Sequence, residues 1–214
     1  MEIDEKRAYR SSLREEQAAE TRRRVLEAAA ECFTESGYQG TSLARIAQRA
    51  GVSVDTVQAT GAKRDILLGA FERAFVGRET RAILDEDTAF SRLVAIPELG
   101  PLIQATCEFT VAATGRIRGL WWAFRGAAAS DPGVQEILAG LLERRRADFR
   151  ALAGLLRERG APIVDEAAVA VEAELLLAPE TYAHFVDDHG WPEERYLEWV
   201  VAGIGRVIGL PPRG

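Results

Sequence analysis

The sequence predicts an all-α protein, and three observations favour this fold class. Apolar residues recur at the three- and four-residue spacing of a helix throughout the 214 residues. No segment shows the strict alternation of a β-strand, and no stretch repeats another. Capping residues, glycines and prolines divide the chain into helical segments. We therefore expect about nine helices.

The first two expected helices lie close together near the N-terminus. The first runs from about residue 16 or 21 to residue 36, and Gly37 ends it as a C-cap. The pair Thr41-Ser42 offers an N-cap for the second helix. Its inner face lies within residues 43–50, and Gly51 ends it after about two turns.

The next two helices come after short breaks. Ser53 caps a third short helix over about residues 54–60, and Gly61-Ala62 breaks the chain again. A fourth helix begins near Lys63 and extends to about residue 84. No linker separates it from the C-terminal helices, so we expect this helix to join the two parts of the protein.

The helices beyond residue 85 are longer. Ser130-Asp131-Pro132 is typical of a cap followed by a proline in the first turn. Gly115 is expected to separate a helix from the segment that contains Trp121, Trp122 and Phe124. The expected helices span about residues 102–113, 132–159, 165–185 and 192–210.

Charge is distributed unevenly along the chain. The net charge is −6, yet residues 21–64 carry seven basic and four acidic side chains. A positive module on an acidic body suits a protein that presents one end to a polyanion. There is no apolar run of membrane-spanning length and no secretory signal, and the two cysteines, Cys32 and Cys107, lack a C-x-x-C partner. A reduced cytoplasmic location and no membrane partner are therefore expected.

The stretch from Thr41 to Val57 has the form of a helix-turn-helix. Two short helices flank Gly51, which permits the sharp reversal between them. In such a motif the second helix enters a major groove about 12 Å wide, while the first crosses the DNA backbone. Double-stranded DNA is therefore the expected partner.

Residues 24–68 also resemble the N-terminal domain of TetR-family regulators. The matching pieces are Val25–Ala29, Phe33, Gly37-Tyr38, Thr41–Leu43, Ile46-Ala47, Ala50–Ser53, Asp55–Val57 and Lys63–Leu68. The resemblance implies an all-helical homodimer, in which a fourth helix joins the helix-turn-helix domain to a larger C-terminal domain for ligand binding and dimerisation. The corresponding division is a mobile arm over residues 1–20, a DNA-binding domain over 21–65, and a ligand-binding and dimerisation domain over 66–214.

The sequence departs from the family at the end of the third helix. Gln58 stands where the family usually has a tyrosine, whose hydroxyl commonly reaches a phosphate. A second aromatic residue is missing before Gly61, as a one-residue deletion. Its loss leaves a gap, at a cost of about 3–5 kcal/mol if the site does not collapse, or shortens the turn.

Position and resemblance together give three sets of candidate residues. The arginine run over residues 22–24 either lies along the DNA backbone or is simply solvated. The expected DNA contacts are Ser42, Arg45, Ser53, Val54, Asp55, Thr56, Gln58, Ala59, Thr60 and Lys63. A ligand pocket is expected at Cys107, Phe109, Thr110, Trp121, Trp122 and Phe124, although core and dimer packing is the simpler explanation of these aromatic residues. A dimer interface is expected at Tyr182, Phe185, Trp199, Val200, Ile204 and Val207.

Other chemistry finds no support in the sequence. His184 and His189 are five residues apart, do not share a helix face, and have no third strong ligand, so no metal site is expected. The glycines of residues 203–209 do not have dinucleotide-binding spacing. There is no nucleophile with a base and an orienting group, so an enzyme is not expected and no cofactor is implied.

The sequence supports two functions as hypotheses. The first is a ligand-responsive transcriptional regulator, expected to be a repressor, that binds a near-palindromic operator as a homodimer and responds to a small, mostly apolar effector. The alternative is a helical ligand-binding or protein-interaction dimer whose DNA-binding module is degenerate.

Overall fold

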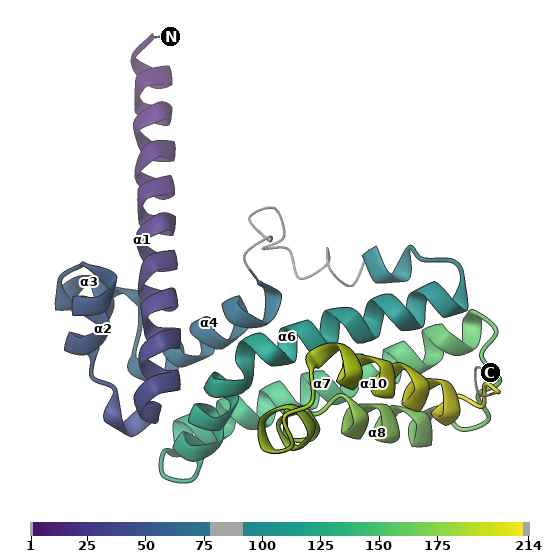
Figure 1. The fold of residues 1–214 in the computed structure, drawn as a ribbon. Helices are drawn as coiled ribbons and strands as arrows, with labels where there is room; N and C mark the ends of the chain where they lie inside the picture. Colours follow the sequence, from purple (N-terminus) through teal and green to yellow (C-terminus); the bar gives the residue numbers. More distant parts are fainter. Residues whose placement is uncertain (1, 78–91, 212–214) are drawn as a thin grey trace.

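The computed structural model describes residues 2–77 and 92–211, with side chains from residue 15 onward. These residues form helices joined by short turns, with no strand among them, as predicted. α1 (Glu2–Gly40) packs against α2 (Leu43–Ala50) and α3 (Val54–Thr60) on one side and α4 (Lys63–Val76) on the other (Figure 1). The rest of the described chain forms a helical bundle of α6 (Leu99–Ala128), α7 (Pro132–Glu158), α8 (Glu166–Leu176), α9 (Pro179–Tyr182), the π-helix η2 (Ala183–Asp188) and α10 (Glu193–Val207).

α1 is longer than the sequence predicts. Residues 2–20, which fall in the arm that the sequence predicts to be mobile, continue the first helix and carry it beyond α3 in Figure 1. The expected break at Gly37 is confirmed, because its φ of 65° leaves the helical region. The expected extension of α4 to residue 84 falls partly outside the described residues, and within them α4 ends at Val76.

Two of the later helices begin where the sequence predicts, and an aspartate caps each of them. The Asp131 carboxylate accepts hydrogen bonds from the backbone N–H groups of Gly133 (2.9 Å) and Val134 (3.2 Å) at the start of α7. Asp165 caps α8 in the same way, at 3.0 and 3.1 Å from the amides of Ala167 and Ala168. Such caps satisfy donors that the first helical turn leaves unpaired.

Gly115 does not break a helix, contrary to expectation. α6 runs through it without interruption. A Cβ built on Gly115 would lie 2.9 Å from Glu193 Oε2 and 3.1 Å from the Tyr182 hydroxyl oxygen. The missing side chain therefore lets α6 approach α9 and α10 closely.

The helix expected over residues 165–185 is divided at Pro179. α8 ends at Leu176, and Ala178 is extended with φ −68° and ψ 144°. A residue before proline is disfavoured in the helical region, and proline has no N–H to continue the hydrogen-bond ladder. The chain restarts as α9 and then widens into η2.

The apolar interior has two clusters. The first joins α1–α4 to the C-terminal half of α6 and the beginning of α7, so the helix-turn-helix shares its core with the body. Within it, the Phe71 ring of α4 lies edge-on to Phe124 of α6, with 5.4 Å between centroids. The second joins the N-terminal half of α6 to the rest of α7 and to α8, α9 and α10. α6 is therefore common to both.

Candidate functional site

The helix-turn-helix is set by local hydrogen bonds at its caps. Ser42 caps α2 and accepts from the Arg45 N–H at 3.2 Å, while Ser53 caps α3 and accepts from the Thr56 N–H at 3.1 Å. Gly51 between them has φ 64° and ψ 41°, a left-handed conformation that favours glycine. Here the predicted caps and turn are confirmed.

α3 presents a polar face to solvent. Val57 is fully buried against the first core, which fixes the rotation of this short helix. Val54, Asp55, Gln58 and Ala59 are consequently exposed, as their predicted role requires. Thr56 and Thr60 are half-buried, and the Thr60 hydroxyl donates to the Thr56 carbonyl at 3.1 Å.

The basic residues of α2 are held by a carboxylate of α1. Arg45 donates to Glu35 Oε2 at 2.9 Å and to the Ser36 hydroxyl at 2.7 Å. Arg49 donates to both oxygens of Glu35, at 2.6 and 2.8 Å. The hydrogen bonds from Arg49, together with the charges of both arginines, lower the pKa of Glu35. Arg45, predicted to contact DNA, is thus ion-paired within the chain.

The arginine run of α1 also bonds within the chain. Arg22 donates to the Thr60 carbonyl at 3.0 Å, at the end of α3. Arg24 donates to the Ala50 carbonyl at the end of α2, and Arg23 pairs with Glu20 and Glu27 on its own helix. The sequence predicts that this run either lies along the DNA backbone or is solvated, and it does not predict these hydrogen bonds within the chain.

Lys63 is covered by an aromatic ring. Its ammonium lies 4.3 Å from the centroid of the Tyr38 ring, and the Tyr38 hydroxyl donates to Asp131 Oδ2 at 3.3 Å. Burial lowers the pKa of Lys63, and the negative charge of Asp131 offsets only part of this effect. This chain of contacts links the start of α4, the end of α1 and the cap of α7.

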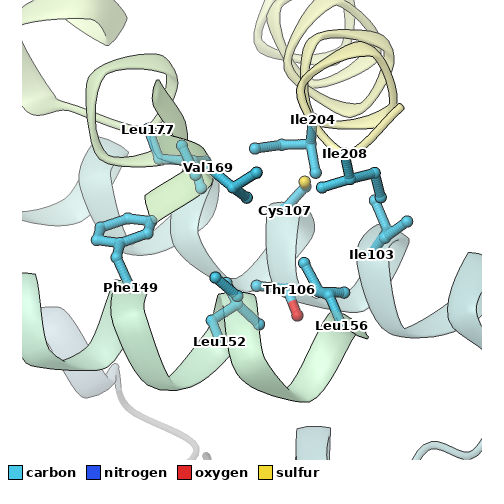
Figure 2. A pocket seen from close by; sticks show the side chains of 12 residues that line it. Ile103, Thr106, Cys107, Phe149, Leu152, Leu156, Val169, Leu177, Ile204 and Ile208 are labelled. Atoms are coloured by element: carbon cyan, nitrogen blue, oxygen red, sulfur yellow. The ribbon is translucent and has the colours of Figure 1, made fainter. Parts of the chain in front are cut away.

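A small cavity lies between α6, α7, α8 and α10, and most of the predicted pocket residues lie outside its lining. Its volume of about 10 Å³ is close to the least that holds one water. Of the six predicted residues only Cys107 lines it (Figure 2). The complete lining is Ile103, Thr106, Cys107, Phe149, Leu152, Ala153, Leu156, Val169, Ala173, Leu177, Ile204 and Ile208.

The other five predicted pocket residues lie elsewhere. Trp121 and Phe124 belong to the first core, where aromatic packing determines their place. Trp122 is 48% exposed. Phe109 packs edge-on against Phe75 of α4, with 5.8 Å between centroids, and the Thr110 hydroxyl donates to its own helix.

Half of the predicted dimer interface is internal. Tyr182, Val200 and Ile204 are at most 5% exposed and pack in the second core of the same chain, so they are not available to a partner. Phe185, Trp199 and Val207 are half-buried and remain candidates.

The two histidines lie close together without forming a metal site. The His184 and His189 rings are 4.6 Å apart, between centroids. Among the described residues, no group of three or more His, Cys, Asp and Glu side chains could hold a metal ion. No helix within the same ranges is long and apolar enough to cross a membrane.

Comparison with known proteins identifies the N-terminal module. Residues 25–57 match the profile of the family described as "Bacterial regulatory proteins, tetR family". The match spans α1 from Val25 to its end, all of α2 and the first turn of α3. No curated protein sequence matches the chain.

Solved structures match most of the chain at low sequence identity. A transcriptional regulator from Pseudomonas aeruginosa PAO1 is similar with TM-score 0.66 and 21% identity, over 88% of this chain and 90% of that one. A TetR-family regulator from Mesorhizobium loti MAFF303099 matches with TM-score 0.63 and 19% identity, over 89% and 96%. A regulator from Saccharomonospora viridis, solved with choline, matches with TM-score 0.64 and 18% identity, over 85% and 94%.

Proposed function

We infer that this chain, a TetR-family transcriptional regulator in its DNA-binding module and its fold, binds a near-palindromic operator as a homodimer and releases it when a small ligand binds. The single observation that carries this proposal is the orientation of α3. Its buried Val57 turns Val54, Asp55, Gln58 and Ala59 outward from a capped helix-turn-helix. That presentation is what insertion into a major groove requires.

The homodimer is supported by an uncovered apolar face. Val164, Val171 and Leu175 are among the most exposed large apolar side chains described, at 102%, 67% and 67%. Ala168, Val171 and Leu175 are exposed at a spacing of three and four residues on one face of α8, and Val164 lies just before its N-cap. This spacing forms one seam of a helix pair. In the proposed dimer, α8 of a second copy covers this face. The α8 face takes the place of the three predicted interface residues that are buried within the chain.

A repressor needs a path from its ligand to its DNA-binding helices. Arg116 of α6 donates to the Ala74 carbonyl at 2.9 Å and to the Phe75 carbonyl at 2.7 Å, at the end of α4. At its other end α4 begins with Lys63, directly after α3. A displacement of α6 would therefore be passed through α4 to the spacing between the two copies of α3, about 34–36 Å apart on DNA.

The ligand differs in kind from choline, with which the Saccharomonospora viridis regulator was solved. A quaternary ammonium is recognised by several aromatic faces. The cavity of this chain has one aromatic residue, Phe149, and the Arg145 guanidinium already lies 4.9 Å from the centroid of its ring. The cavity therefore favours an uncharged, mostly apolar effector.

Selection of bound DNA from a random pool at physiological salt tests the DNA-binding proposal. We expect a near-palindromic motif, with binding weakened in Arg45→Ala. No enriched motif, with binding equal on all sequences and strongly salt-dependent, would support the degenerate module instead.

A second variant tests whether the ion pairs of α2 restrain binding. Glu35→Gln removes the charge that holds Arg45 and Arg49, so we expect several-fold tighter binding to the selected operator. Glu31→Gln is the matched control, because Glu31 lies 3.6 Å from Arg49 at the edge of the same cluster and is 63% exposed. Equal affinities in both variants would contradict this role of Glu35.

A further inference from the structure

The turn between α6 and α7 contacts the end of α1. The Tyr38 hydroxyl donates to Asp131 Oδ2 at 3.3 Å, and the Gln39 amide donates to the Ser130 hydroxyl oxygen at 3.1 Å. The other carboxylate oxygen of Asp131 accepts the capping hydrogen bonds of α7. One side chain therefore holds the start of α7 and the end of α1 together.

The start of α4 joins the same contact. The Lys63 ammonium lies 4.3 Å from the centroid of the Tyr38 ring, which also stacks on Phe33 at 5.9 Å between centroids. A Cβ built on Gly133 would lie 2.8 Å from Arg64 Nη1, so the Arg64 guanidinium lies against the first turn of α7. Since α4 follows α3 after two residues, this contact connects the end of α3 to the helical bundle.

Lys63 differs from nearby arginines in what its donors do. Arg22, Arg24 and Arg45 each donate to an oxygen within the chain. Over the Tyr38 ring the charge of Lys63 is stabilised, but this contact uses none of its three N–H donors. Among the described residues its ammonium makes no hydrogen bond or ion pair. Those donors remain for a partner outside the chain.

Asp131 offsets two costs of placing a cation at this position. Lys63 is the first residue of α4, where the helix macrodipole opposes positive charge. A lysine side chain also has many rotamers, which binding must restrict. The negative charge of Asp131 favours the ammonium, and the Tyr38 ring that Asp131 holds limits the rotamers.

We propose that Asp131 is a positioning residue for DNA binding: through Tyr38 it holds the Lys63 ammonium where its N–H donors meet a backbone phosphate. This inference rests on the proposed DNA-binding function. Contacts to phosphates fix the register of a protein on DNA, and Asp131 makes this contact depend on the position of α7. It is a second link between the helical bundle and the DNA surface, separate from the Arg116 contact at the other end of α4.

Operator binding by Tyr38→Phe tests the link through the hydroxyl. The variant keeps the ring but releases it from Asp131. We expect about three- to tenfold weaker binding to the selected operator, because Lys63 must then be ordered during binding. Tyr196→Phe is the matched control, since it loses a hydroxyl that donates to the Leu176 carbonyl at 2.8 Å in the second core, and it should bind like the parent. Unchanged affinity in Tyr38→Phe, or the same loss in both variants, would overturn the proposal.

Salt dependence shows whether Tyr38 acts through Lys63. Lys63→Gln removes the cation, so the slope of log K against log salt should decrease by about 0.9 for each protomer. In the Lys63→Gln background, Tyr38→Phe should cause no further loss of affinity. Additive losses would show that Tyr38 acts on DNA binding by another route and would refute the assignment.

NMR of the free protein tests the link without DNA. Lys6 and Lys63 are the two lysines of the chain, so the lysine Cε–Hε groups give one reference signal and one test signal. Burial lowers the pKa of Lys63, and the charge of Asp131 opposes that effect. Asp131→Asn keeps a capping residue for α7 but loses the charge, so the pKa of Lys63 should fall further while the Lys6 signal stays as in the parent. An unchanged pKa of Lys63 would contradict the link.

The operator measurements separate this inference from the proposed function. A parent chain that binds no operator would contradict both. Operator binding that neither Tyr38→Phe nor Lys63→Gln weakens would retain the regulator and overturn the role of Asp131.

Discussion

Gly119→Ala tests how α1, and with it the helix-turn-helix, packs on α6. A Cβ on residue 119 would lie 2.3 Å from Thr34 Cγ2, 2.8 Å from its Oγ1 and 3.0 Å from its Cβ. Rotation about χ1 of Thr34 moves the first two atoms but not the third. The two helices must therefore separate by several tenths of an ångström to admit one methyl group.

The magnitude depends on two opposing effects. Overpacking of this kind costs about 1–3 kcal/mol, whereas alanine in place of glycine inside a helix gains about 0.5–1 kcal/mol. We expect Gly119→Ala to lower the free energy of unfolding by about 0.5–2 kcal/mol, or the melting temperature by roughly 1–8 °C for a chain of this size. Urea unfolding at fixed protein concentration measures it.

A double-mutant cycle with Thr34→Ala shows whether this contact is the cause. Thr34→Ala removes the two nearest atoms and leaves the Cβ contact at 3.0 Å. In that background only the contact at 3.0 Å remains, so Gly119→Ala should cost less than it does in the parent, and the two substitutions should couple by about 1 kcal/mol, above the few tenths expected for independent sites. Additive effects would refute the close approach of α1 to α6.

Three further predictions concern stability. Trp121→Phe removes the indole N–H that donates to Glu180 Oε1 at 3.0 Å and should lower the free energy of unfolding by about 1 kcal/mol, measured in urea. Asp131→Ala removes the α7 cap and should cost about 1–2 kcal/mol, whereas Asp131→Asn, another good cap, should cost less. Burial raises the pKa of Glu27, but hydrogen bonds from Arg73 and Arg23 outweigh that effect and leave the pKa below its ordinary value of 4.5. Its stabilisation is therefore present above that value and lost as pH falls through the lowered pKa, so the stability difference between the parent and Glu27→Gln should shrink in acid.

Features encoded by neighbouring residues could be predicted from the sequence. Ser42, Ser53 and Asp131 each act within three residues of themselves, and Gly51 acts through its own backbone angles. Pro179 is an equally local signal for the division of the helix over residues 165–185, although the expected helix ran through it.

The cavity and the interface depend on which helix faces which, and helical spacing does not specify this. The sequence predicts that Trp121 and Phe124 line a pocket. In the structure Phe71 of α4, which is 50 or more residues away in the sequence, packs against both. Tyr182 and Val200 had the pattern of a dimer seam, yet α6 and α8 cover them within the chain. An apolar face shows that a residue is covered, not which element covers it.

Long-range contacts also determine the end of α3, where the resemblance to TetR-family regulators predicts that an aromatic residue is missing. The Arg22 guanidinium reaches the Thr60 carbonyl across 38 positions of sequence, and Arg24 reaches the Ala50 carbonyl across 26. Both cations lie at helix C-termini, where the macrodipole favours positive charge. α1 thus holds the ends of α2 and α3 with arginines that then contribute less to phosphate binding.

This arrangement shifts the DNA-binding proposal toward neutral contacts. α3 contains one charged residue, Asp55, and the arginines of α2 are paired with Glu35. Reading of base edges would then fall mainly to Gln58, and phosphate binding to Arg45 and Arg49 once DNA competes with Glu35. Each phosphate neutralised adds about 0.9 to the slope of log K against log salt, so a regulator built this way should show a shallow salt dependence that steepens in Glu35→Gln.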